Sequence, residues 1–169
     1  HGGHAISITE RQILTLREKG RLLESKLAEL LQFGEENDAI GEKVHRLGTA
    51  LIDAANRDQA LERFAYNLTE DFAVPHVAVR VWGVDAGASE RSEYLPVSDA
   101  VKDLAVNLSE PYCGPHVADE VQGWFGEAAD KLRSFAQVRL SAGDAAGLLV
   151  LASEDAQRFY PEMGTLYLK

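Results

Sequence analysis

The stretch SFAQVRLSAGDAAGLLVLAS, residues 134–153, decides the fold class. Two strand-like runs, Ser134–Leu140 and Ala146–Ser153, flank a short turn at Ser141–Ala145, so the pair is predicted to form a β-hairpin. A third strand is predicted at His76–Trp82, where three valines alternate with residues of the opposite face. The chain therefore contains a sheet, and the rest of the sequence indicates what surrounds it.

Helices are predicted on both sides of these strands. Asn56-Arg57-Asp58 supplies a turn and an N-cap for a helix that extends to Phe72, and Ser98-Asp99 caps a second helix. Residues 119–126 are predicted as a short helix, and a last helix is predicted to begin at Tyr160. Glu93–Val97 fits a short strand, and residues 110–116 fit an irregular connection. This mixture predicts an α+β fold.

The N-terminal segment carries a heptad pattern. Ile13, Leu16, Leu23, Leu27 and Leu30 follow one another at spacings of 3, 7, 4 and 3 residues, and Gly20 occupies the vacant position. A stripe of this kind on a segment without a core of its own must pack on another helix, from this chain or from a second copy. We expect residues 9–33 to form one long helix and the chain to be a homodimer, with the four leucines at the dimer interface.

Residues 35–55 continue the helical pattern, and glycines recur there every seven residues, at positions 34, 41 and 48. One interpretation is a close approach between helices, and the other is chance together with a helix break near Gly34. The sequence thus divides into a coiled-coil-like helical arm, residues 1–55, and a globular domain, residues 56–169.

Charge and composition exclude several classes of protein. The net charge is −10, and residues 61–169 hold 9 Lys/Arg against 17 Asp/Glu, a balance of −8. A surface of this sign repels a phosphate backbone, so we expect no direct nucleic-acid binding. The longest apolar runs, such as Gly147–Ala152, are far shorter than a membrane span, and the first residues lead us to expect no leader segment. We expect a cytoplasmic protein without a membrane partner.

Catalytic chemistry finds little support in the sequence. Cys113 is the only cysteine, which excludes an intrachain disulfide and a zinc site built from several cysteines. Cys113 and His116 are three residues apart, and could be a ligand pair or a nucleophile with its base. The simpler interpretation is a stiff loop with a small, half-buried thiol. We expect no enzyme activity, no metal and no cofactor.

Three separated motifs resemble a known family. The C-terminal run from Gly147 to Ser153, followed by RFYPEMGTL at residues 158–166, is similar to the last strand and helix of GAF domains. More narrowly, the chain resembles a bacterial family called domain of unknown function 484. That family shares the helix start Glu10-Arg11-Gln12 and the turn Pro111-Tyr112-Cys113-Gly114. The resemblance implies a GAF-like antiparallel sheet flanked by helices, with the terminal helices together on the back of the sheet.

The resemblance also implies where a ligand would bind. In a GAF domain the cavity lies between the sheet and the layer of loops and helices formed by the middle of the chain. Residues there that could line it are Trp82, Tyr94, Tyr112, Cys113, His116 and Trp124. The alternative is that these aromatic side chains fill the core. We therefore expect a non-catalytic homodimeric interaction or signalling module, with a small-molecule sensor as the alternative and an enzyme as the least favoured class.

Overall fold

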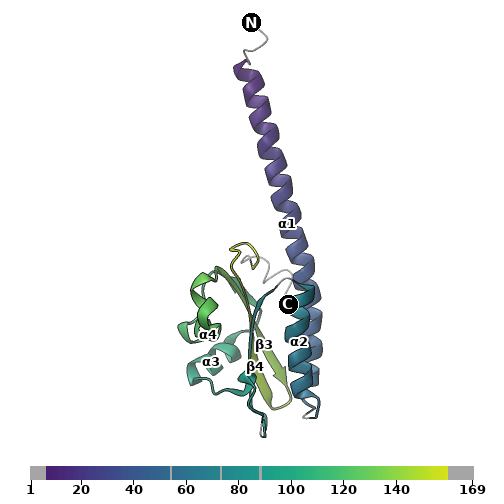
Figure 1. The fold of residues 1–169 in the computed structure, drawn as a ribbon, viewed down its shortest axis with the longest axis vertical. Coiled ribbons are helices and arrows are strands. Elements are labelled where there is room, and N and C mark those ends of the chain that lie inside the picture. The colour runs from purple at the N-terminus through teal and green to yellow at the C-terminus, as the bar shows by residue number, and fades with distance from the viewer. Residues whose placement is uncertain (1–6, 54, 73, 88, 160–169) are drawn as a thin grey trace.

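The computed structural model describes residues 7–53, 55–72, 74–87 and 89–159, and it confirms the α+β fold (Figure 1). A long helix stands on a body made of one sheet and several shorter helices. The described elements are, in chain order, α1 (Ile8–Ala50), α2 (Arg57–Asp71), β1 (His76–Trp82), the 3-10 helix η2 (Ser92–Tyr94), α3 (Asp99–Asn107), β2 (Tyr112–Gly114), α4 (Asp119–Gly123), the 3-10 helix η3 (Gly126–Lys131), β3 (Ser134–Ala142) and β4 (Ala145–Ser153).

The four strands form one open antiparallel sheet in the order β1-β4-β3-β2. The predicted hairpin is confirmed, and its strands are longer than predicted because the turn needs only Gly143 and Asp144. Gly143 has a φ of +57°, a conformation that glycine adopts without strain. Gly147 allows β4 to approach β1, since a Cβ atom there would lie 2.7 Å from the carbonyl oxygen of Arg80.

Three local predictions need correction. Glu93–Val97 is not a strand, because residues 92–94 form η2 and Pro96 has no N–H to donate to a sheet. Residues 110–116 are not wholly irregular, since Tyr112–Gly114 pairs with β3 as an edge strand. The helix does not break near Gly34, because α1 is continuous through it. The helix predicted from Tyr160 lies outside the described residues.

Helices cover both faces of the sheet (Figure 1). α1 and α2 pack on one face over a core that includes Leu61, Leu68 and Leu149. α3 and α4 pack on the other face over a second core that includes Phe135 and Leu148. Neighbouring residues of β4 thus point into different cores, which is the period-2 alternation of a strand with two buried faces.

The long helix α1 has two environments. Ser7 caps its N-terminus, and the Ser7 hydroxyl accepts a hydrogen bond from the Glu10 backbone N–H at 3.0 Å. Ile40, Val44 and Leu47, in its last part, are buried in the same core as α2 and the sheet, although they belong to the predicted arm of residues 1–55. Its first part projects beyond the body (Figure 1). No helix in the described ranges has the length and apolar content that a bilayer span requires.

Candidate functional site

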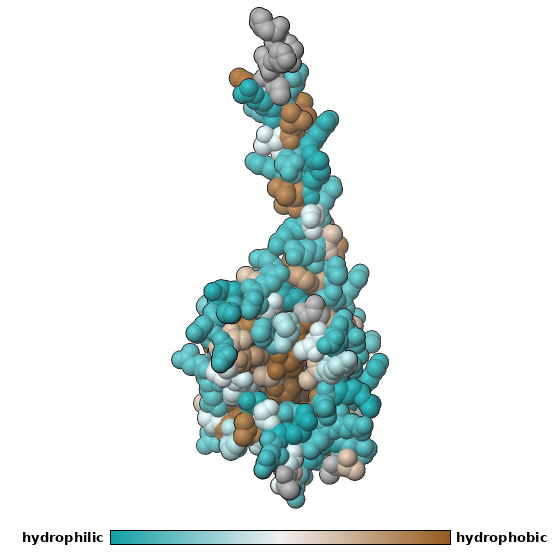
Figure 2. Space-filling model, viewed as in Figure 1, coloured by the Kyte–Doolittle hydropathy of each residue, from teal (hydrophilic) through white to brown (hydrophobic). Residues whose placement is uncertain are grey.

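The projecting part of α1, Ile8–Gln32, exposes a stripe of large apolar side chains. From here on we call this part the arm; it is shorter than the predicted arm of residues 1–55. Leu16, Leu23 and Leu27 are 66%, 71% and 58% exposed, whereas Leu30 is half-buried. Hydrophobic patches follow the arm above the body in Figure 2. Among the described residues no other helix packs on these leucines, so they form a contiguous exposed apolar surface.

The stripe of the arm continues into the face of α1 that packs on the body. The next positions of the same heptad register are Gly34, Asn37, Gly41 and Val44, and all of them except the half-buried Gly41 are buried. A strict seven-residue repeat drifts by about 20° per heptad on a straight helix, so the apolar line winds slowly along the arm. A helix bound to the arm would therefore lie above the body, on the side where the body already contacts α1.

A buried arginine fastens α1 to the body where the arm begins. We call this cluster the arm root and define it as Phe33, Glu36, Asn37, Arg158 and Phe159. Arg158 is only 3% exposed, and its Nη1 donates to Asn37 Oδ1 at 2.5 Å while its Nη2 lies 3.3 Å from the Glu36 carboxylate. The guanidinium stacks on both rings, 4.9 Å from the Phe33 centroid and 4.7 Å from that of Phe159. Burial lowers the pKa of Arg158 and the Glu36 charge raises it.

Cys113 lies in the core beside this cluster and is 5% exposed. Burial raises the pKa of its thiol to about 12, against a smaller lowering effect of the Arg158 charge. At neutral pH the thiol is therefore protonated, which is the less reactive form. His116, the partner considered from the sequence, is exposed.

We predict that Cys113 is chemically inert in the folded protein. Its reaction with a disulfide reagent at about pH 8 should be at least ~100-fold slower than in urea, because the thiol is both protonated and shielded. Cys113→Ser should lower the free energy of unfolding by only about 1 kcal/mol. Rapid labelling of the native protein would show that Cys113 is accessible and activated.

The structure does not gather the predicted ligand-binding residues into one pocket. Trp82 and Trp124 lie on the α3/α4 face, where the Arg80 guanidinium stacks 4.7 Å from the Trp124 ring centroid. Tyr94 and Cys113 pack on the α1/α2 face instead. Tyr112 is half-buried on the edge strand β2, with its ring folded over Gly114. Side chains of the second core fill the space between the sheet and α3/α4.

A groove of about 630 Å³ opens on the other face of the sheet. Its walls are the end of α1, the second half of β3 and the connection 108–111. β2 pairs with β3 only opposite Phe135–Gln137, so residues 138–142 border the groove beyond the end of β2. Gly41 and Gly48 line it, and a Cβ atom at Gly48 would lie 3.8 Å from Ser141 O, an ordinary contact. Within the described part of the chain, these two glycines thus line a groove.

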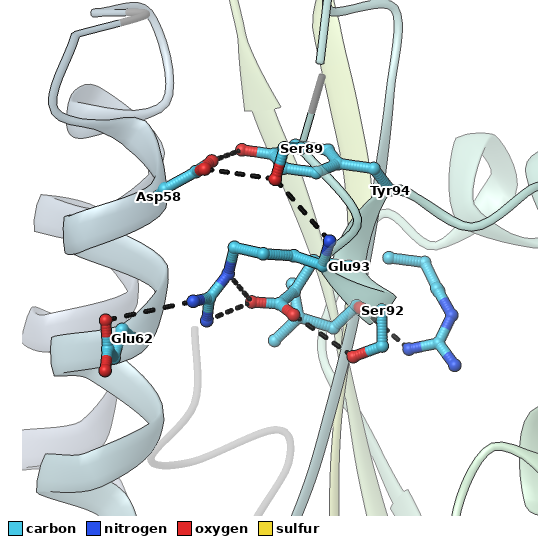
Figure 3. A network of polar contacts seen from close by, with 9 residues as sticks. Asp58, Glu62, Ser89, Ser92, Glu93 and Tyr94 are labelled. Carbon is cyan, nitrogen blue, oxygen red and sulfur yellow. Dashed lines mark hydrogen bonds and ion pairs between the residues drawn. The ribbon is translucent and has the colours of Figure 1, made fainter. Parts of the chain in front are cut away.

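A polar network joins α2 to the segment that contains η2 (Figure 3). The Tyr94 hydroxyl and the Ser89 hydroxyl both donate to the Asp58 carboxylate. Arg91 Nη2 donates to Glu93 Oε2 at 2.7 Å, and Arg91 Nη1 lies 3.8 Å from the Glu62 carboxylate.

The hydrogen bond from Tyr94 lowers the pKa of Asp58, and Ser89 and the nearby arginines add to that effect while desolvation opposes it. Burial is the larger cause, and the neighbouring Asp58 the smaller one, that together raise the pKa of Tyr94 to about 12. The network holds the loop on α2.

We predict an acid-dependent contribution of Asp58 to stability. Its pKa in the folded state lies below the ordinary value of 3.8, so the stabilisation is complete above that value and is lost as the pH falls through the folded pKa. The difference in free energy of unfolding between the wild type and Asp58→Asn should be largest near neutral pH. Urea titrations between about pH 6 and pH 3 should show this difference shrinking. A difference that stays constant over that range would contradict the proposed network.

Sequence reasoning did not predict the contacts of the arm root or of this network, and it named Tyr94 only as a candidate ligand residue. Arg158 carries no pattern that separates it from surface residues, because its partner Asn37 lies 121 positions away in the chain. Asp58 was identified only as part of a turn and N-cap. A polar residue on the apolar face of a helix, as Asn37 is, is the one signal that could have indicated a buried partner.

The comparisons place the chain in a family. A family model described as "Protein of unknown function, DUF484" matches residues 1–169, the whole chain. The chain, an α+β protein with a helical arm on an antiparallel sheet, therefore belongs to the DUF484 family. A search of curated proteins finds no match.

Proposed function

We propose that this protein is a non-catalytic, homodimeric interaction module whose arms pair as a coiled coil. The observation that carries the proposal is the exposed leucine stripe on the arm, at heptad spacing and on a helix with no partner among the described residues. Burying one leucine side chain contributes about 1.5–3 kcal/mol, so an exposed row of them gives a strong drive to associate. The arrangement of helices on both faces of an antiparallel sheet supports a GAF-like body.

The charge distribution supports pairing of the arm with a second copy. Residues 8–33 hold 5 Lys/Arg and 4 Asp/Glu, a balance of +1, whereas residues 34–169 hold 12 and 23, a balance of −11. Both signs alternate along the arm, as in Glu18 with Arg21 and Lys26 with Glu29. Two arms can therefore meet without net repulsion, although two bodies cannot.

The interior of the body supports a non-catalytic role. The space next to Trp82 and Trp124 is packed with apolar side chains, and the Cys113 thiol is protonated at neutral pH. A nucleophile needs an adjacent base, and the exposed His116 imidazole does not reach into the core where Cys113 lies.

A small-molecule sensor is the second candidate, and the groove beside Gly41 and Gly48 favours it. Its volume of about 630 Å³ falls within the range of roughly 300–1,000 Å³ that small-molecule sites occupy. The site would lie between α1 and β3, on the opposite face from the pocket that the resemblance implies.

Light scattering together with native mass spectrometry of the whole chain tests both candidates. We expect a mass of twice 18.5 kDa at micromolar concentration. A monomer up to about 100 µM would be incompatible with pairing of the arms. An additional small mass that stays with the protein would support the sensor.

A further inference from the structure

Three basic side chains surround a hollow between α1 and α2, away from the arm. Lys43 and Arg46 come from α1 and Arg63 from α2, and the hollow has a volume of about 260 Å³. We call it the basic hollow. The remaining lining residues are mostly apolar and include Leu47 and Phe64. No strand residue contributes to it, so the two helices alone form the surface.

The three cations are available for a partner. Among the residues that the structure describes, none of the three forms a hydrogen bond or an ion pair, and the Lys43 ammonium lies over the Phe72 ring, 5.7 Å from its centroid. Glu42 and Glu62 lie near Arg46 and Arg63 in sequence, but in the described part of the chain neither forms an ion pair with the three cations, and Glu62 lies 3.8 Å from Arg91. Three positive charges around one hollow stand out on a body that has a balance of −11.

Size and lining argue for a protein side chain as the occupant. The volume is below the roughly 300–1,000 Å³ of typical small-molecule sites, yet it can take one large apolar side chain. A phosphate backbone would pair with the cations but would not cover the apolar residues that line the hollow, and the acidic body repels it. A carboxylate-bearing peptide with an apolar anchor uses both features.

We propose that the basic hollow docks an acidic amphipathic helix of a partner protein. An apolar side chain of that helix enters between α1 and α2, and acidic residues one turn away on either side pair with Lys43, Arg46 and Arg63. The groove between two packed helices accepts the ridge of a third helix, which is a recurrent mode of peptide recognition. This interaction uses a surface different from the arm and does not depend on dimerisation.

A synthetic peptide tests the proposal on the whole chain. The probe is a fluorescein-labelled alanine-rich helix of about 18 residues with one central leucine and glutamates three and four positions to each side. Anisotropy at about 50 mM salt should show saturable binding that weakens as salt is added. Arg46→Glu with Arg63→Glu should weaken binding at least about tenfold, because two attractive pairs become repulsive.

The control carries the same charge change elsewhere. Lys131→Glu with Arg133→Glu reverses two exposed cations outside the hollow and should leave binding within about twofold, as additivity of distant sites implies. A probe with glutamine in place of leucine should also bind at least about tenfold more weakly. The proposal is overturned if both double variants weaken binding equally, if the glutamine probe binds as well, or if the wild type binds duplex DNA rather than the peptide. Absence of binding at about 200 µM protein would overturn it as well.

Discussion

The double variant Leu23→Glu with Leu27→Glu is expected to convert a dimer into a monomer. Leu23 and Leu27 are each more than half exposed on the isolated arm. A dimer would bury this pair from both chains, so the double variant removes four buried leucines. With about 1.5 kcal/mol or more for each, and with four new negative charges at the seam, the dissociation constant should rise at least about a thousandfold. Light scattering should then give the chain mass of 18.5 kDa instead of twice that value.

A matched variant separates the seam from the added charge. Ser25→Glu with Ala28→Glu adds the same charge to the same stretch of α1, at exposed positions outside the heptad stripe. We expect this variant to remain a dimer. Circular dichroism should show equal helix content in both variants, since the arm leucines make no core contact. If the leucine variant keeps the dimer mass, the dimer interface lies elsewhere.

Features that repeat along the chain could be predicted from sequence. β1 and the β3–β4 hairpin were found because alternation of side chains records two faces of a strand. α3 begins after Ser98 as predicted, and its hydroxyl accepts from the Val101 backbone N–H at 3.2 Å. The long helix followed from the spacing of the leucines. In each case the sequence pattern lies within one helix, strand or hairpin, where the backbone geometry of that element determines the spacing of apolar and capping residues.

Features that depend on distant partners could not be predicted. η2 replaces the expected strand because Tyr94 and Arg91 bind Asp58 and Glu62 on α2, and no local pattern records those contacts. The predicted ligand residues were grouped because the middle of the chain lines the ligand cavity in the GAF domains that this sequence resembles. Trp82 and Tyr94 nevertheless point into different cores, since the sheet passes between them. Arg158 resembled a polar surface residue and is among the most buried charged side chains described.

Arg158→Ala is expected to lower the free energy of unfolding by about 2–3 kcal/mol. The substitution removes the stacking on Phe33 and Phe159, the hydrogen bond to Asn37 and the ion pair with Glu36. Removing one member of a buried pair typically costs about 3–5 kcal/mol, and we expect a smaller loss here because the Glu36 side chain is 24% exposed and can be hydrated. Urea unfolding followed by circular dichroism measures the change.

Two further variants show whether packing or charge provides this stability. Arg133→Ala removes an exposed arginine whose guanidinium donates only to the nearby Asp130 and Leu132 carbonyls, and it should change the free energy by less than about 0.5 kcal/mol. Arg158→Met keeps most of the apolar contact between the two rings, so a loss of only about 1 kcal/mol would assign the larger share to packing.

Because the arm root joins α1 to the segment after β4, hydrogen exchange should accelerate at Phe33–Asn37 in Arg158→Ala and stay unchanged in β1. Equal exchange at both places, or a stability equal to that of Arg133→Ala, would mean that Arg158 does not fasten the arm to the body.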